Sequence, residues 1–330
     1  MPGKPDKPSK SDKLSLCSAQ LLCGIDGGGT STKVVVSNLE GQVLHSFQTG
    51  TINHYGSGIP LARETFAAIA AELIAKCDCL PGTIFTGNSA LDGLADDVLV
   101  GELTDGVFHP SKVVFHSDVY IALLSFTMGK PGAVLISGTG SMACGIDEGG
   151  VYHTAGGWGQ VLGDEGSGYH LALEGIKAAL RAHDGLSEPT LLVDRVMKFF
   201  ELEKMSDLID KIYNPPVKKS FIAAFAPEVD KAAADGDSLA PGLLECEAEW
   251  LYKLALAITR KCKTRNLGYY GSVLNKNDRI RSKLSALLSK QDISLQLPRL
   301  KPEIGAVIGA FHESGHRLSD SVINNLSKYS

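Results

Sequence analysis

A glycine-rich stretch near the start of the chain constrains the fold most. An apolar run over residues 21–25 leads into the motif Asp26-Gly-Gly-Gly-Thr30, and an apolar run with β-branched residues follows over residues 34–36. Glycine adopts positive φ angles and lets a ligand approach the main chain closely. The N–H groups of such a turn form an anion-binding concavity. The stretch therefore predicts a strand, a phosphate-binding turn and a second strand. Asp26 would face a metal ion or its water, because hard cations prefer oxygen ligands.

A second stretch repeats this order. Residues 133–146 contain an apolar run, the small-residue turn Ser137-Gly-Thr-Gly-Ser141 and another apolar run. Each hairpin alone could be purely structural, but two of them indicate an internal duplication, with one ligand held between two like domains. Neither a Walker P-loop nor a dinucleotide fingerprint fits the first turn, because G-x-x-x-x-G-K-[ST] is absent and no helix follows.

Composition narrows the class of protein. A chain of 330 residues favours two domains. The net charge of -5 gives no basic patch for nucleic acid, and no apolar run is long enough to span a bilayer. Seven scattered cysteines indicate free thiols in a reducing compartment. We therefore expect a cytoplasmic protein without nucleic-acid or membrane partners. Residues 1–20 are polar and rich in Pro, Lys and Ser, which predicts a disordered tail.

Two polar residues stand where predicted strands lead into predicted helices. Asn53 lies in a glycine-rich loop before a helix over residues 61–77, where its amide could bind a sugar hydroxyl or stabilise its own turn. Asp118 follows a strand over residues 112–116 and opens an apolar helix. Ligands of open α/β sheets bind beyond the carboxyl ends of strands. Asp118 is thus predicted to be a general base in a cleft, with a helix N-cap as the alternative.

Residues 154–169 are predicted to be irregular because six of these sixteen residues are glycine. Trp158 offers an apolar face, while Asp164 and Glu165 offer acceptors. That combination suits a carbohydrate, although a purely structural loop is the alternative.

Helices are then predicted over residues 171–183, 190–202, 206–213, 219–234, 239–263 and 278–289. A late strand over residues 267–270 ends in Gly271-Ser272, a turn that could contact a nucleoside. The helix from Pro302 carries small residues for close packing.

Taken in order, these motifs resemble those of the N-acetylglucosamine kinases. The matching stretches are Asp26-Gly-Gly-Gly-Thr30, Ser137-Gly-Thr-Gly-Ser141, Gly156-Gly-Trp-Gly159 with Gly163-Asp-Glu-Gly166, Gly271-Ser272 and Gly305-Ala306. That family is similar to the BadF/BadG-type ATPases of the actin, hexokinase and heat-shock ATPase superfamily, and the helical half resembles bacterial N-acetylmuramic acid/N-acetylglucosamine kinases. The resemblance implies an α/β fold of two ribonuclease-H-like domains with a cleft between them. The first domain, residues 21–128 joined by a C-terminal helix over 303–330, would hold sugar and phosphate. The second, residues 129–302, would carry a helical layer and hold the nucleotide.

The resemblance also implies a role for individual residues. Asp26 falls near Mg²⁺ through a water, and Asp118 matches the catalytic aspartate. The phosphates of ATP would meet Gly28, Gly29, Thr30, Lys33, Gly138, Thr139 and Gly140, and the adenosine would meet Gly271 and Ser272. The sugar would meet Asn53, Asp118, Gly157, Trp158 and Asp164. Asn88-Ser89 departs from the glycine-rich form of the family and has no assigned role. Relatives are often dimers, so a homodimer is expected.

The predicted reaction is phosphoryl transfer from MgATP to O6 of an amino sugar. N-acetylglucosamine, N-acetylmuramic acid and glucosamine are the candidate substrates, and glucose differs from them by groups that one side chain could admit or reject. One alternative is an ATPase that activates a 2-hydroxyacyl-CoA dehydratase or benzoyl-CoA reductase, which would bridge an iron–sulfur cluster with cysteines. The other is a non-enzymatic, sugar-sensing or actin-like regulator.

Overall fold

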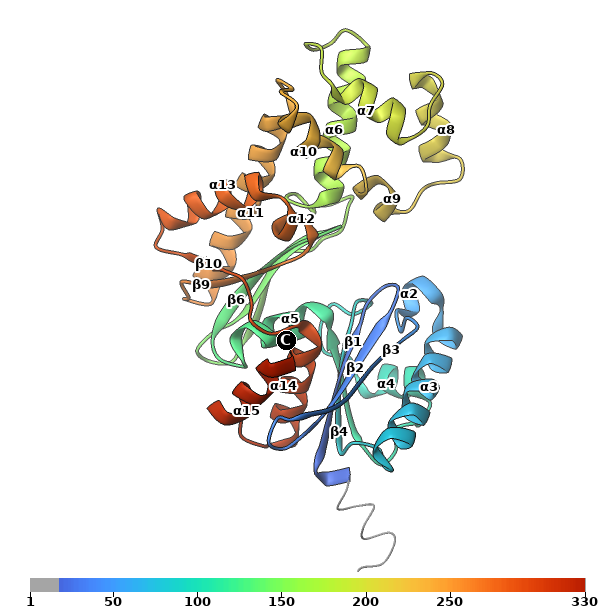
Figure 1. Ribbon diagram of the computed structural model, residues 1–330, viewed down its shortest axis with the longest axis vertical. Coiled ribbons are helices and arrows are strands. Elements are labelled where there is room, and N and C mark those ends of the chain that lie inside the picture. Colours follow the sequence, from blue (N-terminus) through green and yellow to red (C-terminus); the bar gives the residue numbers. More distant parts are fainter. Residues whose placement is uncertain (1–17, 330) are drawn as a thin grey trace, which may run out of the picture. The chain divides into compact units, whose positions relative to one another are not determined.

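The computed structural model describes residues 18–329 (Figure 1). The chain divides into two compact units, one reaching Lys130 and resuming at Pro298, the other spanning Pro131–Leu297. These divisions lie a few residues from the boundaries expected after residues 128 and 302. Most of the expected N-terminal tail, residues 1–17, lies outside the described residues. Ser18 is held in place, because its carbonyl accepts a hydrogen bond from the Gly82 N–H at 2.7 Å.

The first unit is built on a five-stranded sheet in the order β3-β2-β1-β4-β5. Its strands are β1 Leu21–Gly27, β2 Thr32–Asn38, β3 Val43–Thr49, β4 Thr83–Asn88 and β5 Lys112–Ser117. The first three form an antiparallel meander, while β4 and β5 run parallel to β1. The register sets Gly27, Asn88 and Ser117 level at one edge of the sheet. The segments that follow β1, β4 and β5 therefore leave the sheet side by side.

The second unit repeats this arrangement in the order β10-β9-β6-β7-β8. Its strands are β6 Gly132–Ser137, β7 Ser141–Ile146, β8 Tyr152–Gly156, β9 Asn266–Tyr270 and β10 Ser294–Gln296. Strands β6 to β8 form an antiparallel meander, and β9 and β10 add on in parallel. The shared strand order confirms the predicted duplicated α/β fold of two ribonuclease-H-like domains.

Helices cover both faces of the first sheet (Figure 1). They are α2 His54–Ser57, α3 Ile59–Cys77, α4 Asp97–Thr104, α5 Asp118–Thr127, α14 Pro302–Ser314, α15 Asp320–Leu326 and the 3₁₀ turn η2 Ser327–Tyr329. Helices α3 and α4 lie on one face, and α5 and α14 lie on the other. The prediction of one C-terminal helix over 303–330 is wrong. Helix α14 ends at Gly315, which takes the left-handed conformation (φ 75°) that terminates helices.

Small residues let α14 pack closely, as predicted. A Cβ atom at Gly305 would overlap the carbonyl oxygen of Ile121 in α5 and lie 2.8 Å from the backbone nitrogen of Ser125. A Cβ at Gly309 would lie 2.7 Å from the ring of Phe85 in β4. The C-terminal segment is thereby fixed against the strands and helix that carry the candidate site.

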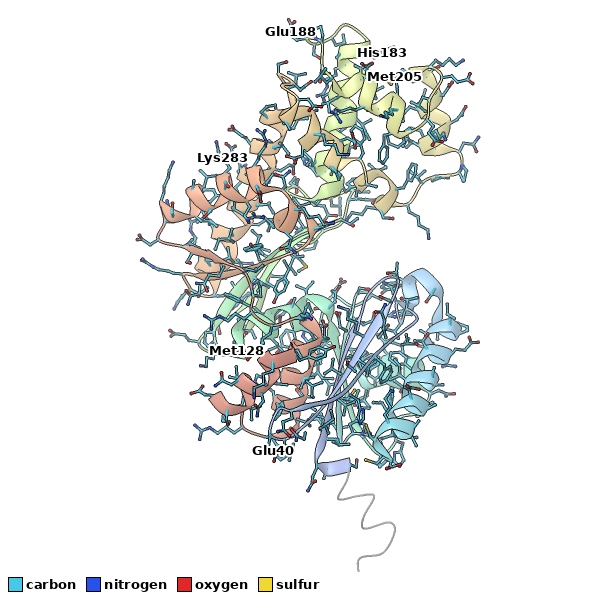
Figure 2. All side chains as sticks on the ribbon, in the orientation of Figure 1. Glu40, Met128, His183, Glu188, Met205 and Lys283 are labelled. Carbon is cyan, nitrogen blue, oxygen red and sulfur yellow. The ribbon has the colours of Figure 1, made fainter. Side chains whose placement is uncertain are left out.

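The helices of the second unit form a thick layer on one side of its sheet. They are α6 Gly168–His183, α7 Leu192–Phe199, η1 Met205–Asp207, α8 Leu208–Tyr213, α9 Lys219–Ala223, α10 Ala226–Ala234, α11 Ala240–Lys261, α12 Ser272–Lys276 and α13 Asp278–Ser289. Helix α11 packs along β6, β7 and β8. Each unit has its own apolar core, and Met205 lies in the core of the second (Figure 2).

Two predictions about the second unit are corrected. The single helix expected over residues 219–234 is two helices, because Pro227 in the first turn of α10 has no N–H with which to continue a helix from α9. The stretch 154–169 is not irregular throughout. Residues 154–156 complete β8 by pairing with β7, and α6 begins at Gly168.

Within the described part of the chain, no helix combines the length and the apolar character that a membrane crossing requires.

Candidate functional site

Carboxylates gather around the carboxyl end of β1. Asp26 pairs across the hairpin with Lys33, and the Nζ of Lys33 lies 3.4 Å from an oxygen of Glu303 in α14. Burial, then the nearby charge of Glu303, and to a smaller extent that of Asp118, raise the pKa of Asp26 to about 6, although Lys33 lowers it. Glu303 is only 2% exposed, and its Oε2 meets no hydrogen-bond partner among the described residues. This end of the sheet therefore carries more negative charge than its own cations balance.

Asp118 is the first residue of α5 but not its cap. The hydroxyl of Ser117 caps the helix by accepting the Tyr120 N–H at 3.3 Å, so the alternative that Asp118 is the N-cap is wrong. Burial raises the pKa of Asp118, while hydrogen bonds from the N–H groups of Val119 and Asp118 lower it. Its carboxylate thus lies near the end of β1 that carries Asp26, and it contacts first-turn N–H groups of α5 although Ser117 is the N-cap residue.

Asn53 has contacts within the protein that limit what it can offer a ligand. It caps α2 by accepting the Gly56 N–H at 2.9 Å, which is the turn-stabilising role foreseen as an alternative. Its side-chain amide also donates to the hydroxyl of Ser89 at 2.9 Å. Asn88, fully buried, donates to the Ile52 carbonyl at 3.2 Å. The Asn88-Ser89 segment, to which the sequence motifs assigned no role, therefore holds the Asn53 loop in place through hydrogen bonds.

Three of the predicted nucleotide residues line one cavity of the second unit. This cavity of about 340 Å³ is walled by Gly138 and Thr139 of the β6–β7 turn, by Ser272 of α12 and by side chains of α6, α9 and α10. Gly271, with φ 101°, presses against that turn, because a Cβ there would overlap the Ser137 carbonyl. Cavities of this size are typical of small-molecule sites. The structure thus brings Gly138, Thr139, Gly271 and Ser272 together.

Asp164 fastens the glycine-rich loop to the second hairpin. Its carboxyl group is buried (5% exposed), forms an ion pair with Lys219 of α9, and accepts the Ser141 N–H at 3.3 Å. The ammonium of Lys219 would lie 2.9 Å from a Cβ at Gly140, so it stands beside the turn. Nothing in the sequence around Lys219 pointed to it, since its partner lies far away in the chain. Trp158 from the same loop is 74% exposed.

A buried acid in the helical layer supports the same loop. Glu247 of α11 is 1% exposed, and its carboxylate accepts the Gly166 N–H at 2.6 Å and contacts Nδ1 of His170 at 2.7 Å. No spacing in this helix had pointed to a chemical role. A signal was present: Leu244, Glu247 and Leu251 share the apolar face of α11, where an unpaired acid would be costly.

This pair predicts a pH-dependent contribution to stability. The hydrogen bond to Glu247 raises the pKa of His170 above its ordinary value of 6.5, even though burial lowers it. A raised folded-state pKa stabilises the protein fully below pH 6.5, and that stabilisation is lost as the pH rises through the folded-state pKa. We expect Glu247→Gln to lower the free energy of unfolding at pH 6 by about 1–3 kcal/mol, and therefore the Tm by several degrees. The difference in Tm between the variant and the wild type should narrow as the pH rises.

Thermal unfolding between pH 5.5 and 8.5 checks this expectation. Glu245→Gln is the matched control, because Glu245 lies on the same helix but pairs with Lys283 at the surface. The control should keep the pH profile of the wild type. A Glu247→Gln profile parallel to that of the wild type would show that the pair does not titrate as described.

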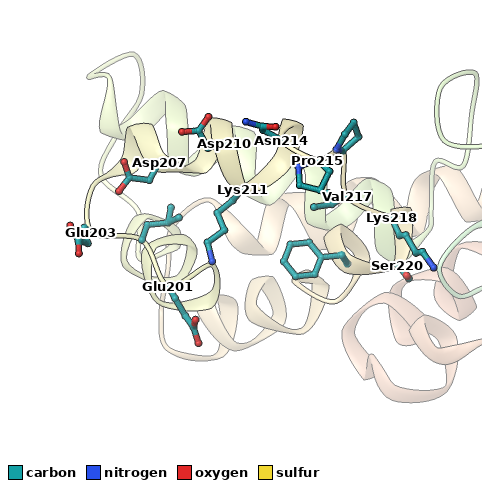
Figure 3. A pocket seen from close by; sticks show the side chains of 13 residues that line it. Glu201, Glu203, Asp207, Asp210, Lys211, Asn214, Pro215, Val217, Lys218 and Ser220 are labelled. Atoms are coloured by element: carbon teal, nitrogen blue, oxygen red, sulfur yellow. The ribbon is translucent and has the colours of Figure 1, made fainter.

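A larger hollow of about 860 Å³ lies elsewhere in the second unit (Figure 3). It is lined by residues between positions 201 and 221, among them Glu201, Asp207, Asp210 and Lys211. None of the predicted site residues borders it. Convergence of predicted ligand-binding residues, rather than volume, therefore identifies the smaller cavity as the candidate nucleotide site.

The fold and the two glycine hairpins define a class of protein, the actin-like ATPases with duplicated ribonuclease-H-like domains. More specifically, the chain belongs to the BadF/BadG/BcrA/BcrD ATPase family, whose sequence pattern matches residues 23–310.

Relatives with curated names are similar over most of the chain. An N-acetylmuramic acid/N-acetylglucosamine kinase of Clostridium acetobutylicum is 29% identical over 303 residues, which cover 88% of this chain and 98% of the relative. An N-acetyl-D-glucosamine kinase of Dictyostelium discoideum is 31% identical over 257 residues, or 74% of this chain and 81% of the relative. A solved structure from Chromobacterium violaceum has the same fold, with a TM-score of 0.72, 23% identity and coverage of 88% of this chain and 99% of that one.

Proposed function

We propose that this protein is an ATP-dependent kinase that transfers a phosphoryl group to O6 of an amino sugar, with Asp118 as general base. The observation that carries the proposal is the convergence of Gly138, Thr139 and Ser272 on one cavity, with Gly271 packed against the same turn, in a chain of an ATPase family. The choice of an amino sugar draws on the relatives, which are named as kinases of N-acetylmuramic acid or N-acetylglucosamine.

Phosphoryl transfer requires that the phosphates and the attacking hydroxyl be held in position and that the charge of the transition state be stabilised. The turns after β1 and β6 would hold the phosphates through their N–H groups, with Lys33 adding positive charge beside the first turn and Gly140 completing the second. Asp118 would accept the proton of the attacking hydroxyl. On the sugar side we include Asn53, Asp118, Gly157, Trp158 and Asp164. The exposed ring of Trp158 offers a face for the apolar side of a sugar.

The residues at the end of β1 fit a magnesium ion. Within residues 18–329, His, Cys, Asp and Glu side chains form no group of three or more that could hold a metal by themselves. Mg²⁺ is usually bound by one or two carboxylates together with waters and substrate phosphates. Asp26 and the unpartnered Oε2 of Glu303 supply such a setting. When bound, the ion would neutralise phosphate charge, and Asp26 would hold it through water.

The names of the relatives favour a kinase over an activator of a dehydratase or reductase and over a non-enzymatic regulator. We further propose that the protein acts in the cytoplasm as a homodimer, without nucleic-acid or membrane partners.

A coupled assay of ADP release tests the proposal. The panel is N-acetylglucosamine, N-acetylmuramic acid, glucosamine and glucose, each with MgATP. We expect ADP release to depend on at least one amino sugar and to be slower with glucose. ATP hydrolysis that no sugar on the panel accelerates would contradict a kinase. Binding of a sugar without any ADP release would favour a sensor.

A further inference from the structure

We propose that Thr51 and Ser89 are positioning residues, which fasten the loop carrying Asn53 to the glycine turn after β1. The loop and the turn would then behave as one rigid piece, so that a sugar held by Asn53 has a fixed place relative to phosphates held by the turn. The identity of both ligands rests on the proposed function. The hydrogen bonds that fasten the loop to the turn all lie within the first unit.

Hydrogen bonds through two hydroxyl groups form the fastening. The Thr51 hydroxyl donates to the Gly28 carbonyl at 2.9 Å and accepts the Asn53 N–H at 3.0 Å. On the other side, the Ser89 N–H donates to the Gly27 carbonyl at 2.9 Å, and the Ser89 hydroxyl accepts from the Asn53 side-chain amide at 2.9 Å. These contacts make a closed ring that starts and ends on two adjacent residues of the glycine turn.

Ile52, which lies between Thr51 and Asn53, packs against the start of the glycine turn. Ile52 is fully buried, and a Cβ on Gly27 would overlap its side chain, so the two segments are in direct contact. The Ile52 carbonyl accepts from Asn88, whose own side-chain oxygen accepts the Ala90 N–H at 2.9 Å. Apolar packing therefore brings the segments together, and the hydroxyl groups set their register and orientation.

The ring also decides what Asn53 can present to a ligand. An Asn side chain has two N–H donors and one carbonyl oxygen. The oxygen already accepts the Gly56 N–H, and one donor is committed to Ser89. Among residues 18–329 the second N–H meets no acceptor, so it can meet an oxygen of the sugar, and the second lone pair of the amide oxygen can accept from a sugar hydroxyl. Ser89 thus fixes which way the amide points, and Thr51 fixes where its backbone lies.

Kinetics of Thr51→Val test the inference, because valine keeps the shape of threonine and removes its hydroxyl. Misplacing a reacting group by about 1 Å can cost roughly 10²-fold in rate. We expect kcat/KM for the sugar to fall by about 10- to 100-fold. The KM for ATP should change less than that for the sugar, because the cavity that would hold the nucleoside belongs to the second unit. Thr51→Ser keeps the hydroxyl and should recover most of the activity.

Thr104→Val is the matched control. Thr104 is a buried threonine of the first unit whose hydroxyl, like that of the half-buried Thr51, donates to a backbone carbonyl, that of Val100 at 2.8 Å, but it lies in α4 outside the ring. This control should leave the sugar kinetics unchanged. Ser89→Ala opens the ring on its other side and should likewise weaken sugar binding, measured by calorimetry, whether or not Thr51→Val folds.

The outcomes separate this inference from the proposed function. A wild type that phosphorylates no amino sugar contradicts the proposed function. An active wild type whose Thr51→Val and Ser89→Ala variants keep the sugar KM and kcat contradicts only the positioning role. Equal impairment of Thr51→Ser and Thr51→Val would also overturn it, because the loss would then come from the methyl group and not from the hydroxyl.

Discussion

Replacing Asp118 with asparagine is expected to lower kcat by about 10²–10⁴-fold, the usual contribution of a general base. The substitution keeps the size of the side chain, and Ser117 continues to cap α5. Binding of sugar and nucleotide should therefore change little. Since burial raises the pKa of Asp118 and the base must be ionised, the activity of the wild type should fall as the pH drops through that raised pKa.

Steady-state kinetics, with sugar binding measured by calorimetry, check this prediction. Asp97→Asn is a matched control, because Asp97 is also the first residue of a helix that a neighbouring side chain caps, and it lies outside the site. Near-normal kcat in Asp118→Asn would remove Asp118 from the role of general base. Loss of sugar binding together with kcat would instead make it a binding residue.

Asp26→Asn is expected to abolish most of the activity and, at the same time, to stabilise the protein. Burial and the charge of Glu303 raise the pKa of Asp26 from 3.8 to about 6. Each unit of pKa shift corresponds to about 1.4 kcal/mol, so holding this carboxylate ionised in the folded state costs on the order of 3 kcal/mol. Asparagine has no such cost. It also removes the charge that we propose holds Mg²⁺.

The raised pKa of Asp26 also sets the pH range over which Asp26→Asn is expected to stabilise the protein. A raised folded-state pKa favours the folded state at low pH, and the advantage is lost as the pH rises from about 4 to about 6. Above pH 6, Asp26→Asn should therefore melt several degrees higher than the wild type, and the gap should close towards pH 4. Thermal melts without Mg²⁺ measure this directly. A variant that melts lower than the wild type at pH 7 would contradict the account of the carboxylate cluster.

Much of the fold could be predicted because its signals are local. Asp26-Gly-Gly-Gly-Thr30 and the β-branched residues after it contain both the turn and the strand preference, and the second hairpin repeats them. The errors arose where a tertiary contact or one residue overrides a pattern. Pairing with β7 draws residues 154–156 into β8, and Pro227 divides an otherwise continuous helical stretch.

The candidate site was predictable only in part. Gly138, Thr139 and Ser272 could be singled out because glycine turns after strands are visible in sequence, and the fold places them around one cavity. Thr51, Ser89, Lys219 and Glu247 were missed because each acts through a partner distant in the chain. Sequence spacing carries no information about such pairs, apart from an acid such as Glu247 on an apolar helix face. The N-cap alternative for Asp118 could be excluded only once the structure showed Ser117 as the cap, and its role as general base stays a proposal.

Phosphorus NMR of the reaction product tests the central claim most directly. The wild-type protein is incubated with MgATP and the amino sugar that gives the fastest ADP release. The account predicts a phosphomonoester whose phosphorus couples to both protons on C6 of the sugar. A phosphate coupled to the anomeric proton, or inorganic phosphate as the only product besides ADP, would contradict it.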